Sequence, residues 1–195
     1  MNPQAAHEHI YQRLRAELDP AYAYHSLAHT EDVVAATREI AELEGVSERE
    51  TDLLVTAAWY HDCGFIIGSQ DHELRGCEIV RETLPGFDFT EQDIEAICGM
   101  IMATKIPQFP TNKLEEILAD ADLDYLGRSD FGEIGDRLFV ELSNHDILSD
   151  RLTWDRIQIS FLEKHTYFTS TNIERRRPQK LQHLHELEHR VAHAG

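Results

Sequence analysis

Residues 57–64 read Ala-Ala-Trp-Tyr-His-Asp-Cys-Gly. This stretch predicts a helix whose last turn holds two possible metal ligands, His61 and Asp62. Two adjacent residues inside a helix point about 100° apart, so His61 and Asp62 would not normally face one core. At the last turn before Gly64, both side chains can converge on a single metal ion. Taken alone, the His-Asp pair is a weak signal, because a buried histidine beside a solvated aspartate explains it more simply.

Apolar residues recur at helical spacing on both sides of this stretch. Ser47, followed three residues later by Glu50, is a capping box and predicts the start of the helix that runs to Asp62. No segment shows the pattern of a convincing strand. The predicted helices span residues 7–18, 29–44, 47–62, 71–84, 90–104, 113–126, 129–148, 153–165 and 177–193. The expected fold is therefore all-α, one domain of about eight or nine helices in residues 1–195.

Composition narrows the class of protein. The chain has 195 residues, of which 42% are hydrophobic and 28% charged, and its formal net charge is −18. Such a surface repels nucleic-acid backbones and anionic membranes. No run reaches the roughly 20 apolar residues of a membrane span, and the N-terminus lacks a signal-peptide core. Three cysteines without a CxxC pair fit a reducing cytoplasm, which is the expected compartment.

Two further segments could supply metal ligands. His29 begins a predicted helix, and Asp120 and Asp122 lie in the apolar run Ile-Leu-Ala-Asp-Ala-Asp-Leu at residues 117–123. Buried carboxylates cost several kcal/mol unless they are paired or bound to a metal. Imidazole nitrogens and carboxylate oxygens suit one divalent ion, for which Mn, Fe, Ni, Zn, Co and Mg are all candidates.

The order His, His-Asp, Asp, with Ala-Ala before the pair, resembles the HD superfamily of metal-dependent phosphohydrolases. Residues 24–29, 120–123 and 161–169 resemble a subgroup of small predicted HD hydrolases. The resemblance implies an all-α domain with a core at about 22–130 and C-terminal helices at 130–195 packed on it. It also implies that the metal ligands are His29, His61, Asp62 and Asp122. Asp120 competes for the last place, but the final Asp of the superfamily usually follows Ala, as Asp122 does.

A second motif follows the pair. His72 and Gly76 resemble a segment of the superfamily in which the histidine helps bind a second metal, together with a histidine on the next helix. Residues 97–105, at the end of the next predicted helix, contain no histidine. This departure favours one metal and leaves His72 to contact substrate or donate a proton. Nearby candidates for phosphate or supporting contacts are Glu73, Arg75 and Lys105, while Tyr24 and His25 flank the first ligand.

These features predict hydrolysis of a small phosphorylated metabolite, with a nucleotide among the candidates. A metal would activate water, Asp62 or His72 would accept its proton, and Arg75 and Lys105 would offset phosphate charge. Two alternatives stay open: a di-iron oxygenase on the same fold, and a non-catalytic, metal-stabilised nucleotide-binding regulator. The expected partner is the small substrate, with neither a nucleic-acid polymer nor a membrane, and a homo-oligomer stays open.

Overall fold

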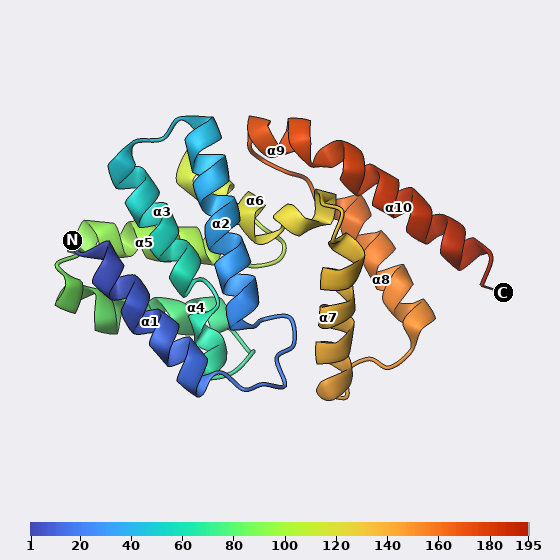
Figure 1. Ribbon diagram of the computed structural model, residues 1–195, viewed down its shortest axis with the longest axis horizontal. Helices are drawn as coiled ribbons and strands as arrows, with labels where there is room; N and C mark the ends of the chain where they lie inside the picture. Colours follow the sequence, from blue (N-terminus) through green and yellow to red (C-terminus); the bar gives the residue numbers. More distant parts are fainter. Residues whose placement is uncertain (195) are drawn as a thin grey trace.

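A computed structural model describes residues 1–194. Within that range the chain forms ten α-helices and three short 3-10 helices, without a strand, which confirms the all-α class (Figure 1). The first six α-helices are α1 (Pro3–Glu17), α2 (Leu27–Glu44), α3 (Glu48–Tyr60), α4 (His72–Thr83), α5 (Glu91–Ala103) and α6 (Lys113–Asp122). The others are α7 (Phe131–Asn144), α8 (Arg151–Lys164), α9 (Ser170–Arg175) and α10 (Arg177–Ala192). The 3-10 helices are η1 (Cys63–Ile66), η2 (Leu84–Phe87) and η3 (Asp124–Gly127).

Local sequence explains most of the helix ends. Ser47 and Glu50 form the predicted capping box at the start of α3, and Thr90 with Asp93 forms another at the start of α5. Gly45 ends α2 with a φ of 67°, a left-handed conformation that glycine adopts without steric cost.

The structure differs from the predicted spans at several helix ends and in one missed helix: α1 begins at Pro3 rather than at residue 7, and α7 ends at Asn144 rather than at residue 148. The segment expected as one helix at residues 113–126 is α6 followed by η3, so the helix ends at Asp122 rather than at Gly127. The short helix α9 was missed. Its six residues are too few for a periodic pattern to develop, although Thr169 caps its start by accepting a hydrogen bond from the backbone of Asn172.

Helices α1 to α6 enclose the larger of two hydrophobic clusters. Helix α3 lies inside this bundle, where it packs against α1, α2, α5 and α6. Ala57 and Ala58 are fully buried on it, and small side chains at these positions allow neighbouring helices to approach closely. Figure 1 shows α2 and α6 on the side of this bundle that faces the C-terminal helices. The last turn of α3 is therefore held in the interior of the molecule.

A second hydrophobic cluster joins η3 to the C-terminal helices. Its members include Leu126, Phe131, Leu162 and Leu184, and α10 packs along α8 and η3. Helices α7 and α8 meet through side chains: Arg151 pairs with Asp136, and a Cβ atom on Gly135 would lie 2.7 Å from Gln158 Nε2. None of the described helices is long and apolar enough to cross a membrane.

The carboxylate of Glu44 ties the end of α2 to the start of α9. Its Oε1 accepts hydrogen bonds from the Ser170 hydroxyl, the Thr171 hydroxyl and the Thr171 backbone at 2.7–2.9 Å. The Lys113 ammonium lies 3.4 Å from its other oxygen. The Thr171 hydroxyl, its backbone N–H and the Ser170 hydroxyl lower the pKa of Glu44 from 4.5 to about 2, although burial opposes this shift. The ionised carboxylate of Glu44 therefore holds the start of α9.

We predict that Glu44→Gln lowers the free energy of unfolding by about 1–2 kcal/mol at pH 7. The folded pKa lies below the unfolded value, so this stabilisation is present above about pH 4.5 and fades as the pH falls toward 2. Urea unfolding at pH 7 and pH 3 should show the difference between wild type and variant shrinking at the lower pH. Glu42→Gln, at an exposed position of the same helix, should change stability little at either pH. A difference that stays constant with pH would contradict this account.

Candidate metal centre

The backbone after α3 turns sharply at the predicted pair. The helix ends at Tyr60, His61 caps it, and Asp62 leaves the helical region with φ −104° and ψ 7° before η1 begins. A Cβ atom on Gly64 would overlap the backbone carbonyl of His72, so only glycine allows η1 to lie this close to the first turn of α4. Gly64 does more than end a helix, because it brings His72 toward Asp62.

Three side chains from three helices meet at one point. His29 comes from the first turn of α2, His61 from the end of α3 and Asp122 from the end of α6. Each offers one ligand atom, and these atoms lie within 4.8 Å of one another. The two Nε2 atoms are 3.3 Å apart, and Asp122 Oδ1 lies 3.2 Å from that of His29. Two ring nitrogens and a carboxylate oxygen that face one another in this way are suited to a shared cation.

Asp62 completes the set in a way that favours a cation. Its Oδ2 lies 3.3 Å from His29 Nε2 and 3.1 Å from His61 Nε2, yet this buried oxygen accepts no hydrogen bond from the described residues. A buried carboxylate oxygen without a partner is costly. The opposite side of the His61 ring is held by the Ala58 carbonyl, 2.8 Å from Nδ1, so Nε2 is the nitrogen left to bind a metal. The four residues therefore fit one divalent ion.

The electrostatics of these groups agree with the geometry. Burial by itself would lower the pKa of His29, but Asp122 and Asp62 outweigh it and raise the pKa to about 9. Burial would likewise raise the pKa of Asp122, but His29 and His61 lower it to about 2. The pKa of His61 is raised well above its ordinary value, because the attraction of Asp62 and Asp122 exceeds the effect of burial. The pocket thus attracts positive charge, which protons or a metal ion can supply.

Asp120 and Asp122 of α6, and Asp124 just after them, lie in different environments. Asp120 is fully buried and faces away from the histidines, accepting hydrogen bonds from the backbones of Phe168 and Thr169 at 2.9 Å and from the Thr169 hydroxyl at 2.6 Å. Asp124 lies in η3 and accepts from Arg176 Nε at 2.7 Å. Asp122 alone of the three is grouped with His29 and His61.

A cavity of about 210 Å³ opens beside these residues. Asp62 and Asp122 line it, and so do His72 and Glu73 of α4. His72 Nε2 lies 3.5 Å from Asp62 Oδ1 and 3.5 Å from Glu73 Oε1. The structure therefore brings three of the five predicted catalytic residues, Asp62, His72 and Glu73, to one wall of the cavity.

Arg75 and Lys105 lie elsewhere. Neither side chain lines the cavity. The Lys105 ammonium is exposed and lies 3.0 Å from Asp71 Oδ1, and the Arg75 guanidinium packs beside Gly68. Both are near the metal ligands in sequence, but the side chains of Arg75 on α4 and of Lys105, which follows the end of α5 at Ala103, lie outside the cavity lining.

Glu141 is a buried residue of this region that the sequence analysis missed. It lies on α7, is 5% exposed, and accepts hydrogen bonds from the backbones of Tyr24 and His25 at 2.8 and 2.9 Å. Its other oxygen lies 2.5 Å from His25 Nδ1, and the His25 ring stacks on Phe65. Glu141 thus orients His25, which lines the cavity. A signal was available, because Glu141 follows Ile134 and Leu138 at helical spacing on an otherwise apolar face.

Comparison with known proteins agrees with the geometry. Residues 26–124, slightly more than half of the chain, match the HD domain. The chain belongs to the HD domain family. The matched segment begins just before His29 and ends just after Asp122, so it contains every residue of the metal centre described above.

Two solved structures share the fold. A predicted HD superfamily hydrolase from an uncultured Thermotogales bacterium is 20% identical, with a TM-score of 0.63 over 100% of this chain and 94% of its own. Bacillus subtilis YpgQ in complex with ADP is 19% identical, with a TM-score of 0.64 over 96% of this chain and 98% of its own. No curated protein matches the chain. At these identities the likeness shows the fold alone.

We predict that Gly64→Ala destabilises the protein by at least about 3 kcal/mol, because the new Cβ meets backbone rather than a flexible side chain. The midpoint of urea unfolding checks this. Gly86→Ala is the matched control, since a Cβ there has no atom within 4 Å, and it should stay within about 0.5 kcal/mol of wild type. Equal midpoints for the two variants would show that η1 can move away from α4 at little cost.

We predict that Asp122→Asn weakens metal binding by more than about 100-fold. Asp120→Asn should retain the metal and lose only stability, because Asp120 holds the segment before α9. Metal content per chain after dialysis, followed by titration with Mn²⁺, separates the two variants. If Asp120→Asn lost the metal and Asp122→Asn kept it, the assignment of the last ligand would have to be reversed.

Proposed function

We propose that this protein is a metal-dependent phosphohydrolase that acts on a small phosphorylated metabolite. The observation that carries the proposal is the group of His29, His61 and Asp122, with the unpartnered oxygen of Asp62 beside it, at the wall of a cavity. A divalent ion held there would act as a Lewis acid toward a phosphoryl oxygen and lower the pKa of a bound water. The HD domain makes hydrolysis the natural chemistry for such a site.

The side chains around the cavity would carry out the proton transfers of the reaction. We assign Asp62 the proton of the attacking water, and its position between the imidazoles and the cavity supports this role. His72 Nδ1 lies 3.3 Å from the Ser69 carbonyl, which directs Nε2 toward the cavity side of Asp62. We assign His72 the proton that the leaving oxygen needs. His25, oriented by Glu141, contributes a second imidazole to the same wall.

The choice of substrates for a first screen follows from one of the similar solved structures and from the net charge of the chain. Because YpgQ was crystallised with ADP, nucleotides belong in the panel beside sugar phosphates and simple phosphate esters. The formal net charge of −18 supports a small substrate over a nucleic acid. Metal analysis of the purified protein should come first, and the phosphate panel should then be run with the metal that is found. A protein that binds metal and nucleotides but hydrolyses nothing in the panel would be a regulator instead.

We predict that His72→Gln lowers kcat by roughly 10²–10³-fold while the metal content stays at the wild-type level. The reason is that Gln keeps the size and polarity of the side chain but cannot transfer a proton. Activity and metal content should be measured on the same preparation, with His185→Gln on the exposed face of α10 as the control. Loss of metal from His72→Gln would make His72 a ligand rather than an acid, and an unchanged kcat would remove it from the chemistry.

A further inference from the structure

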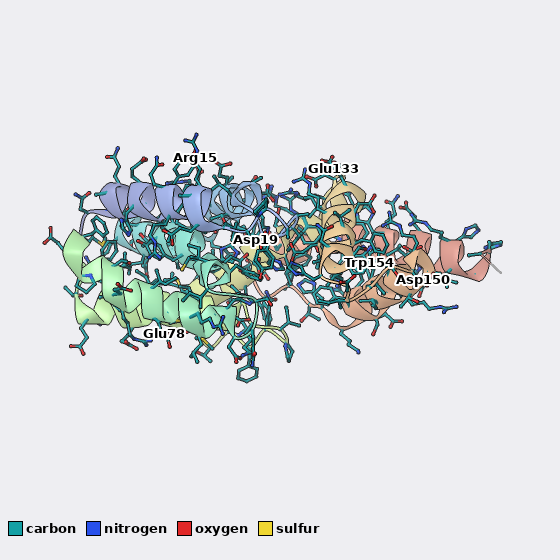
Figure 2. All side chains as sticks on the ribbon, turned by 90° about the horizontal axis from the view of Figure 1, so that it is seen from below. Arg15, Asp19, Glu78, Glu133, Asp150 and Trp154 are labelled. Carbon is teal, nitrogen blue, oxygen red and sulfur yellow. The ribbon has the colours of Figure 1, made fainter. Side chains whose placement is uncertain are left out.

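The wall of the cavity that faces the metal centre is apolar. Leu138 of α7 and Trp154, Ile157 and Phe161 of α8 form what we call the apolar wall, and all four line the same cavity as Asp62 and Asp122. Figure 2 shows Trp154 between the ribbons of α7 and α8, and its ring lies beside Phe139 of α7 with 6.3 Å between the ring centroids. The cavity therefore has a charged side at the metal centre and an apolar side between these helices.

The apolar wall is not sealed by the protein itself. Ile157 lines the cavity and is 46% exposed, and Leu138 and Phe161 are only partly buried. Apolar surface that stays in contact with water inside a concave site favours an apolar ligand, because burial of that surface is the main source of affinity in such pockets. The Nε1–H of Trp154 is buried there without a hydrogen-bond partner among the described residues, so an acceptor atom on the ligand would be satisfied.

The charges of the cavity limit how much phosphate it can hold. Its lining, within residues 1–194, contains the carboxylates Asp62, Glu73 and Asp122 but neither a lysine nor an arginine. Sites for diphosphates and triphosphates normally rely on such basic side chains. Here a metal ion, His25 and His72 are the groups that can face a phosphate. These groups can face one phosphoryl group, whereas a chain of two or three would meet three carboxylates without a basic side chain in the lining.

Resting on the proposed function, we infer that the substrate is a phosphate monoester of an uncharged, largely apolar alcohol, with its apolar part against Leu138, Trp154, Ile157 and Phe161. In the reaction, the water oxygen forms a bond to phosphorus and the ester P–O bond breaks. The leaving oxygen takes a proton, and the products are the free alcohol and inorganic phosphate. The apolar wall selects the alcohol, and the lack of basic side chains selects against nucleoside diphosphates and triphosphates.

The first test compares methyl, butyl and octyl phosphate with glycerol 3-phosphate and ADP, using the full chain loaded with its metal. We expect kcat/KM to rise by up to about fourfold for each methylene that the wall buries, and octyl phosphate to exceed ADP. Ile157→Gln should reduce the ratio of kcat/KM for octyl over methyl phosphate by about tenfold. Ile173→Gln, at a 41% exposed isoleucine of α9 outside the cavity, should leave that ratio at the wild-type value. Equal values for methyl and octyl phosphate, or a preference for ADP, would overturn the inference.

The second test does not require turnover. Octylphosphonate and methylphosphonate have a P–C bond that hydrolysis does not cleave, and calorimetry gives their affinities for the metal-loaded chain. Tighter binding of octylphosphonate, weakened in Ile157→Gln but not in Ile173→Gln, would support the apolar wall even if every phosphate ester proved inert and the proposed function failed. Equal affinities would reject the apolar wall even if phosphate esters were hydrolysed.

Discussion

The structure depends on the burial of two imidazoles and two carboxylates at the meeting point of three helices. His29, His61, Asp62 and Asp122 are drawn from α2, α3 and α6, and none is more than slightly exposed. Charged groups are stable in such an interior only when each faces an opposite charge. That requirement sets where α2 begins and where α3 and α6 end, because the ligand atoms must come within a few ångströms of one point. The rest of the N-terminal bundle supports those three helix ends.

The C-terminal helices give this centre its surroundings. Helix α7 reaches it through Glu141, which holds the backbone at residues 24–25 and the ring of His25. Helix α8 contributes Trp154 and Phe161 to the cavity, and η3 joins both helices to the end of α6. Most of this region lies beyond residues 26–124, the part that matches the HD domain. The shared segment therefore carries the chemistry, while the helices that follow it shape the space in which a substrate would lie.

Much of the helical order could be predicted because it is local. A capping box such as Ser47 with Glu50, or a glycine such as Gly45, acts within one turn of the chain and can be seen in the sequence. The order of the four metal-centre residues was also visible, although choosing Asp122 over Asp120 relied on resemblance to a family. The short helix α9 could not be predicted in this way, because six residues show no periodic pattern and a distant residue, Glu44, holds its start. The break between α6 and η3 was not predicted either, and there Asp124 contacts the distant residues Asn172 and Arg176.

By itself, the sequence determined the all-α class, most helix spans and His29, His61 and Asp62 as candidates to bind a metal together with one aspartate of α6, since periodicity, caps and residue chemistry are properties of the chain. Only the tertiary structure decided which aspartate of α6 faces the histidines, because two residues of separation turn a helical side chain to the opposite face. It also decided that Gly64 leaves room for the first turn of α4 and that Glu141 orients His25. The side chains of Arg75 and Lys105 lie outside the cavity lining for the same reason. These outcomes depend on how closely segments far apart in the sequence approach one another, and tertiary packing sets those distances.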